Sequence, residues 1–122
     1  MADAQPSAAG SGHPAAEETM LLTVFLRHDQ SQDLVEQRDK LDAVDWWNGF
    51  PPAGCEVVSW VVAMGVGQIV TLRLPPRLLQ SVNVELERRA WGVFQTDFYP
   101  TYDFRETRER LVREANERTG RA

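Results

Sequence analysis

Residues 56–64 read EVVSWVVAM, which is the most strand-like stretch of the chain. Valine and aromatic residues favour strands, and here apolar residues occupy both alternating sets of positions, so both faces of the strand are apolar. The turn Gly65-Val66-Gly67 follows, and residues 68–74 (QIVTLRL) resume the strand pattern, which predicts a β-hairpin. A strand that is apolar on both sides usually has both sides buried. The hairpin therefore predicts a sheet that is covered on both faces.

Strand and helix patterns alternate around this hairpin. Runs of aliphatic, β-branched and aromatic residues predict strands, whereas apolar residues three or four positions apart predict helices. Pro- and Gly-rich stretches separate these runs and exclude regular structure there. Before the hairpin we expect a strand over 21–28 and a helix that Ser31 caps, with Leu34, Leu41 and Val44 on its apolar side, ending at 48–54. After it we expect a helix from Pro75-Pro76 to Gly92 with the stripe Leu79, Val82, Leu86 and Ala90, a strand over 93–99, and a peripheral helix over 105–118.

The order of these elements is β-α-β-β-α-β with an extra C-terminal helix. This order predicts the α+β class and a ferredoxin-like fold, in which an antiparallel sheet has the first and third strands in its centre and the helices on one face. The other face of the sheet then has no cover from its own chain. A second copy of the chain is the simplest cover, so we expect a homodimer that forms through the sheet.

Composition limits the partners of the protein. The chain has 122 residues, which is room for one domain. Thirteen basic against 18 acidic side chains give a net charge of −5, which argues against nucleic-acid and membrane partners. Cys55 is the only cysteine, so neither an intrachain disulfide nor a cysteine-based zinc site is possible. We expect Cys55 to be inert and the protein to be cytoplasmic.

Residues 1–19 differ in composition from the rest of the chain. They contain six Ala, two Gly, two Ser and two Pro, with no Lys or Arg and no large aliphatic residue beyond the initial Met. Such a segment has neither the basic start nor the apolar run of a secretory signal, and it cannot bury enough apolar surface to become ordered. We therefore expect a disordered tail over 1–19 and a single domain over 20–122, and either Met1 or Met20 as the natural start.

The predicted element order resembles that of the dimeric α+β-barrel proteins over residues 20 to about 104. These include muconolactone isomerases, cofactor-free antibiotic-biosynthesis monooxygenases, some polyketide cyclases and EthD-like proteins. The strings LRHDQS (26–31), GFPPAGCEVVSW (49–60), MGVGQIVTLRLP (64–75) and FYPTYDF (98–104) are also similar to bacterial proteins without an assigned activity. The resemblance rests on element order, so it implies a barrel-like homodimer and carries no catalytic residue over by motif.

His28 and Gln68 are the expected catalytic residues. Alternation places His28 on the helix-facing side of the first strand, and the resemblance to these barrels implies a small-molecule pocket between sheet and helices. A histidine there can act as a general base near neutral pH, and Gln68 can donate a hydrogen bond to a substrate carbonyl or enolate. Alternatively, His28 bonds the backbone of the next helix. Asp29 is expected to be a turn or cap residue.

Aromatic residues are the expected substrate-binding groups. Trp91 lies near His28 in the predicted topology, and one of the adjacent Trp46 and Trp47 can line a pocket, although filling of the core is the simpler role for any one ring. Residues 98–104 hold four aromatics and predict either a clamp on the second subunit or a lid on the pocket. Arg27, Arg73 and Asp97 fall on the partner-facing side of the sheet, where they can form ion pairs. The expected binding residues are Trp91, Trp47, Trp60, Tyr99, Tyr102 and Asp103.

These residues favour a small enzyme that needs no cofactor. Metal binding would require carboxylates to join His28, and the sequence has no cluster with ligand spacing, so neither metal nor organic cofactor is expected. We expect an isomerase, cyclase or monooxygenase acting on a small carbonyl-containing or aromatic metabolite. The alternative is a non-catalytic small-ligand-binding or assembly protein of the same fold. A cavity between sheet and helices would favour the enzyme, and a filled core would favour the alternative.

Overall fold

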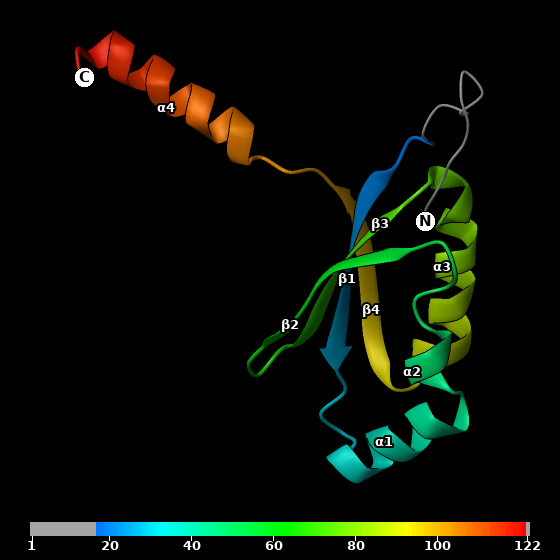
Figure 1. The fold of residues 1–122 in the computed structure, drawn as a ribbon. Coiled ribbons are helices and arrows are strands. Elements are labelled where there is room, and N and C mark those ends of the chain that lie inside the picture. The colour runs from blue at the N-terminus through cyan, green and yellow to red at the C-terminus, as the bar shows by residue number, and fades with distance from the viewer. Residues whose placement is uncertain (1–16, 122) are drawn as a thin grey trace, which may run out of the picture.

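A four-stranded antiparallel sheet forms the centre of the computed structural model, which describes residues 17–121 (Figure 1). The strand order is β2-β3-β1-β4, so the first and third strands are central. This confirms the expected α+β class and antiparallel sheet. Residues 1–16 of the expected tail lie outside the described residues. The strands are β1 (Met20–His28), β2 (Glu56–Ala63), β3 (Gly67–Leu74) and β4 (Phe94–Thr101).

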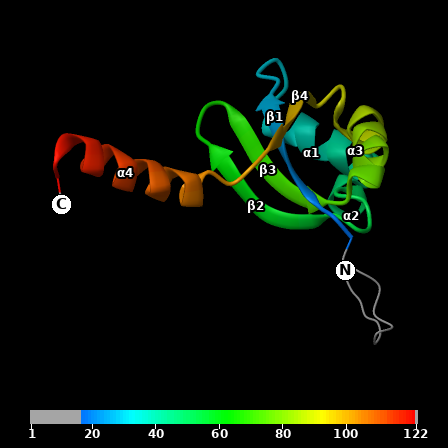
Figure 2. The same ribbon diagram turned by 90° about the horizontal axis from the view of Figure 1, so that it is seen from above.

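The helices divide into a layer against the sheet and one helix that stands apart. Figure 2 shows α1, α2 and α3 on one side of the sheet, whereas α4 extends away on the opposite side. The helix predicted after Pro75-Pro76 begins with a 3-10 turn and ends in a π-helical turn. The helices are α1 (Leu34–Ala43), α2 (Trp46–Gly49), the 3-10 turn η1 (Pro76–Leu78), α3 (Leu79–Glu85), the π-helical turn η2 (Leu86–Ala90) and α4 (Arg105–Thr119).

The hydrophobic core lies between the helix-facing side of the sheet and α2, α3 and η2. Alternate residues of β1 and β3 point into it, as the two-residue period of a strand requires. The expected stripe of the second helix is confirmed, because Val82, Leu86 and Ala90 are buried and Leu79 packs against them. The other buried apolar residues are Leu22, Val24, Leu26, Val70, Leu72, Leu74, Leu41, Trp46, Phe50, Val93 and Phe94.

The start of α1 differs from the prediction. The N-cap is Asp33 rather than Ser31: the Asp33 carboxylate accepts from the Glu36 amide at 2.8 Å, and the Glu36 carboxylate accepts from the Asp33 amide at 3.0 Å. This reciprocal pair is a capping box, which satisfies two backbone donors at once. Ser31 instead donates its hydroxyl and its amide to Asp29. Asp29 is therefore a turn residue, as expected.

α1 does not cover the sheet as its apolar spacing predicts. Leu34 is 77% exposed, and of the three predicted apolar positions only Leu41 is buried. Figure 1 places α1 at the end of the sheet where β1 stops, beside α2. Because the core is already filled by α2, α3 and η2, the first half of α1 has no apolar surface to pack against.

β2 is exposed on both of its faces within one copy of the chain. Val61 is 51% exposed and its neighbour Val62 is 66% exposed, although they point to opposite sides of the sheet. Met64, just beyond the end of β2, is 92% exposed. The expected burial of both faces is therefore not achieved by residues 17–121 of a single copy.

Arg89 joins η2 to the end of α1. Its guanidinium donates to the carbonyls of Val44 and Asp45 and forms an ion pair with Glu85, and both charged side chains are less than one-fifth exposed. The last carbonyls of a helix have no partner within the helix. Arg89 supplies one for Val44, the C-cap of α1, and it also binds the carbonyl of Asp45, the N-cap of α2, so it fixes the turn that leads into α2.

We expect Arg89→Met to lower the free energy of unfolding by about 2–3 kcal/mol, because it removes the charged donor of the Val44 carbonyl and the better-buried of the two arginines that pair with Glu85. Arg88→Met is the matched control, since Arg88 pairs with the same Glu85 from a side chain that is 63% exposed. It should cost less than about 1 kcal/mol. Urea unfolding of both variants measures the difference, and equal losses would contradict the role given to Arg89.

Candidate functional site

His28 ends β1 on the helix-facing side of the sheet. It follows the buried positions Val24 and Leu26 at the two-residue period, as predicted, and is itself half-buried. The imidazole packs edge-on against Phe94, with ring centroids 6.2 Å apart. The His28 amide donates to the Val66 carbonyl at 2.9 Å, which ties the end of β1 to the hairpin turn. The backbone amide of His28 therefore binds the hairpin turn and not the backbone of the next helix.

A surface depression of about 440 Å³ lies beside His28. The end of β1, the loop to α1, the first turns of α1 and the hairpin turn build it. Most of the lining residues have polar side chains, but the surface that they expose to the depression is mostly apolar, so the depression suits a small ligand with both apolar and polar groups. The lining residues are His28, Asp29, Gln30, Gln32, Asp33, Leu34, Gln37 and Gly65.

Two side-chain amides in this depression have unused hydrogen-bonding capacity. Gln37 is only 7% exposed, and its amide donates to the Asp29 carbonyl at 3.5 Å, the outer limit of a hydrogen bond. The buried Oε1 atom of Gln32 has no donor among residues 17–121, while its Nε2 donates to Asp29 and to the Gly92 carbonyl. Sequence patterns did not identify either residue, because a glutamine in a polar turn (Gln32) or on a polar helix (Gln37) gives no signal that it is buried.

Asp29 is held as an anion by its own turn. The hydroxyl and amide of Ser31 and the side-chain amide of Gln32 donate to its carboxylate, and these bonds lower the pKa of Asp29. Hydrogen bonds to the charged form of a carboxyl favour that form. Asp29 is therefore ionised and already engaged at neutral pH, so it contributes negative charge to the depression but no free base.

Gln68 lies on the helix-facing side of β3 and is bound by Trp60. The Trp60 indole donates to Gln68 Oε1 at 2.7 Å. In the sheet, Gln68 lies beside Leu26 of β1 and Val62 of β2. Leu26 precedes His28 by two positions, and Gln68 is not among the residues that line the depression beside His28. The expected pair of His28 and Gln68 thus lies on one sheet face, with the Gln68 carbonyl oxygen occupied by Trp60.

The expected binding tryptophans lie in different places. Trp91 is 62% exposed and lines a second depression, of about 340 Å³, with residues of β4. Trp47 is also exposed, and its ring lies 6.2 Å from that of Trp60. Trp46 is completely buried and stacks on Phe50 with centroids 4.6 Å apart. Of the adjacent pair, Trp46 thus fills the core and Trp47 remains available at the surface.

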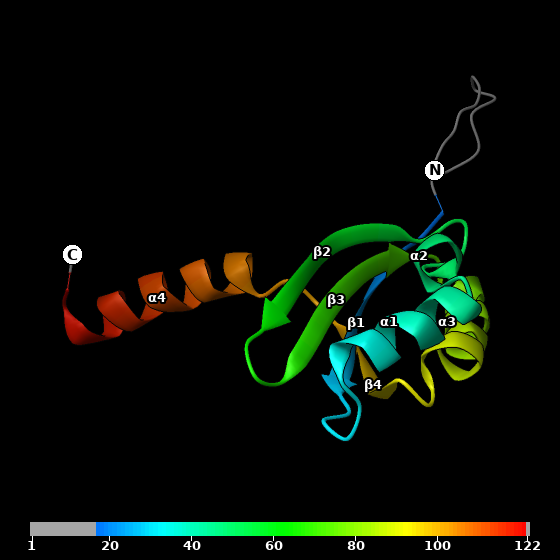
Figure 3. The same cartoon turned by 90° about the horizontal axis from the view of Figure 1, so that it is seen from below.

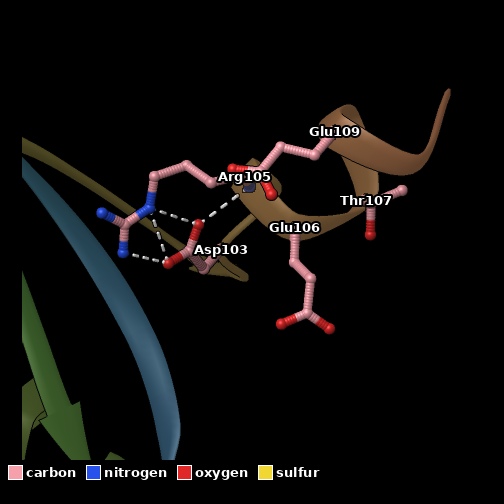
Figure 4. A pocket seen from close by; sticks show the side chains of 5 residues that line it. All are labelled: Asp103, Arg105, Glu106, Thr107 and Glu109. Atoms are coloured by element: carbon pink, nitrogen blue, oxygen red, sulfur yellow. Dashed lines mark hydrogen bonds and ion pairs between the residues drawn. The ribbon is translucent and has the colours of Figure 1, made fainter. Parts of the chain in front are cut away.

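The remaining predicted residues gather at the opposite end of the sheet. Tyr102 and Asp103 line a shallow depression of about 300 Å³ with Arg73. Asp103 also forms a bidentate ion pair with Arg105 (Figure 4). This pair borders a surface hollow of about 500 Å³ at the start of α4. Tyr99 packs against Phe25 on the sheet face that the helices leave open.

Cys55 is half-buried after the Pro- and Gly-rich loop. Burial raises the pKa of its thiol, because a low-dielectric environment disfavours the thiolate. Since the thiolate is the nucleophilic form, Cys55 is held in its unreactive state. Its environment fits the expectation that this cysteine is inert.

The Asp103–Arg105 pair gives a pH prediction. Hydrogen bonds from Arg105 lower the pKa of Asp103 from 3.8 to about 2. Because the folded-state pKa is depressed, the pair's contribution to stability is complete above pH 3.8 and is lost as the pH falls through about 2. A carboxyl NMR titration should find the low value, and Arg105→Gln should raise it. Arg110→Gln, on the same helix, is the control; a pKa near 3.8 in the unaltered protein would contradict the pairing.

Comparisons with protein-family models, curated proteins and solved structures found no match to this chain. Within residues 17–121, no helix has both the length and the apolar character needed to cross a membrane. The same part of the chain has no group of three His, Cys, Asp or Glu side chains placed to hold a metal ion.

Proposed function

We propose that the protein is a homodimer with a ferredoxin-like fold in each subunit, and that it acts as a non-catalytic assembly or small-ligand-binding protein. The observation that carries this proposal is the filled layer between the sheet and α2, α3 and η2. Trp46 and Val82 are fully buried there, and Phe50 is 4% exposed. A barrel enzyme with its pocket between sheet and helices would need this space for its substrate.

The open face of the sheet supports the dimer. Its centre is apolar: Phe25, Val61 and Ile69 lie side by side on three neighbouring strands, and Tyr99 packs edge-on against Phe25. Soluble monomers seldom expose a continuous apolar patch of this kind. A second copy of the same face would bury it.

The polar groups of the open face also favour burial, because they satisfy one another. A buried charge or donor is costly only when it has no partner. Here hydroxyl groups bond across the strands and opposite charges pair at both ends of the face, so covering it leaves few groups without a partner. The pairs are Thr23 with Thr71 and with Thr101, Arg27 with Asp97 at 3.2 Å, and Arg73 with Glu56 at 3.4 Å.

Two adjacent valines provide a matched test of the dimer. The protein should sediment at about twice its chain mass of 13.8 kDa. Val61→Arg, on the open face, should raise the dimer dissociation constant at least 100-fold, because two guanidinium groups would meet across the two-fold axis or be desolvated there (about 2.7 kcal/mol). Val62→Arg, on the other face of the same strand, should change it less than threefold.

Sedimentation equilibrium of the unaltered protein, Val61→Arg and Val62→Arg measures the three dimer dissociation constants. A monomeric wild-type protein at micromolar concentration would refute the dimer. Equal weakening by both substitutions would show that copies associate through another surface.

Catalysis at His28 is the second candidate function. The depression beside His28 combines an imidazole with the buried side chain of Gln37 and the buried Oε1 atom of Gln32, which has no donor among residues 17–121. An imidazole can remove a proton next to a carbonyl group at neutral pH. This arrangement supports an isomerase, cyclase or cofactor-independent monooxygenase acting on a small carbonyl-containing or aromatic metabolite.

The two candidates differ in what His28→Ala does. If His28 is a general base, a panel of small ketones, enols and hydroxyaromatic acids should contain a compound that the protein converts, and the variant should convert it 10²- to 10⁴-fold more slowly. Gln30→Ala, in the same depression, should keep most of the rate. Activity that survives in the folded His28 variant would remove it from catalysis, and absence of turnover across the panel favours the assembly function.

A further inference from the structure

α4 is a helix of 15 residues with none of them buried. It leaves the end of β4 and extends away from the domain, on the side of the sheet opposite to α1, α2 and α3 in all three views (Figures 1, 2 and 3). An isolated helix of this length is marginal in water, because most helical stability in proteins comes from packing of an apolar face. α4 therefore lacks, within residues 17–121, the packing that a helix of its length requires.

One side of α4 has the character of a docking surface. At 100° per residue, Leu111 and Ala115 fall on the same side as Phe104, and Val112 flanks them. Leu111 and Val112 are 42% and 40% exposed. We call this side the α4 stripe; it consists of Phe104, Arg108, Leu111, Val112, Ala115 and Arg118.

Charge is distributed unevenly around the same helix. Arg108 and Arg118 lie on the stripe, and neither forms an ion pair with residues 17–121, whereas Glu106, Glu109 and Glu117 lie on the far side. The docking side is therefore basic as well as apolar. It complements a surface that is acidic and apolar.

The rest of the chain has the opposite charge. Residues 105–121 carry six Arg and four Glu, whereas residues 17–104 carry seven basic and thirteen acidic side chains. Attraction therefore favours the body of a second copy over a second α4 as the partner of the stripe. The body of the same copy is not available, because α4 points away from it.

We infer that α4 is an exchanged arm: in the homodimer, the stripe of each α4 docks on the body of the other copy. This inference rests on the proposed dimer through the open sheet face. A copy seated on that face lies on the side to which α4 extends, and two-fold symmetry repeats the contact. One interface then covers both the open sheet face and the α4 stripe.

Two arginines of α4 supply a matched test. Arg108 lies on the stripe and Arg113 on the far side, and both are exposed. Arg108→Glu should raise the dimer dissociation constant at least tenfold and increase amide hydrogen exchange across α4. Arg113→Glu makes the same charge change and should alter both measurements less than threefold. In the unaltered full-length protein, α4 amides should be protected at concentrations where the dimer forms and should lose protection on dilution.

Three results would overturn the inference. A stable dimer with rapidly exchanging α4 amides would overturn the exchanged arm alone and leave the sheet-face dimer intact. A monomer at all concentrations would overturn both proposals. Concentration-independent protection of α4, unaffected by Val61→Arg, would show that the helix does not dock on a second copy.

Discussion

The stacking of Trp46 on Phe50 is the contact on which the arrangement of the domain depends. The two rings are nearly parallel, and Trp46 also meets Trp60 of β2 and Phe94 of β4. One side chain thus holds α2 against both edge strands of the sheet. Arg89 sets the backbone just before it by binding the carbonyls of Val44, the C-cap of α1, and Asp45, the N-cap of α2. Trp46, Phe50 and Val82 are buried together, so side chains of the described residues occupy the layer between the sheet and α2, α3 and η2.

Elements fixed by local spacing were predictable, and those fixed by distant contacts were not. Val82, Leu86 and Ala90 repeat every four residues, so the sequence alone identified their buried side. In contrast, the bond between Arg89 and Val44 spans 45 positions, and nothing in either neighbourhood indicates it. Ser31 and Asp33 are both good capping residues, and the choice between them depends on which one Asp29 binds in the preceding turn.

In the candidate site, too, the features set by local spacing were predictable and those set by distant contacts were not. The position of His28 on the helix-facing side followed from the two-residue period of β1. The partner of Gln68 did not, because the indole of Trp60 reaches it diagonally across the hairpin, from a position that is paired with Val70 and not with Gln68. The burial of Gln37 depends on where α1 packs, and α1 lies at the end of the sheet rather than over it.

The strand order also limits how far the sheet can be extended by other chains. The outer edges are β2 and β4, and a free edge offers unpaired backbone groups to any neighbouring strand. β4 carries Asp97 and Pro100, which make its edge a poor template. β2 has a single charged residue, Glu56, at its first position. Pairing through β2 would therefore leave two β4 edges on the outside, and the charge and the proline on each of them disfavour the addition of a further strand.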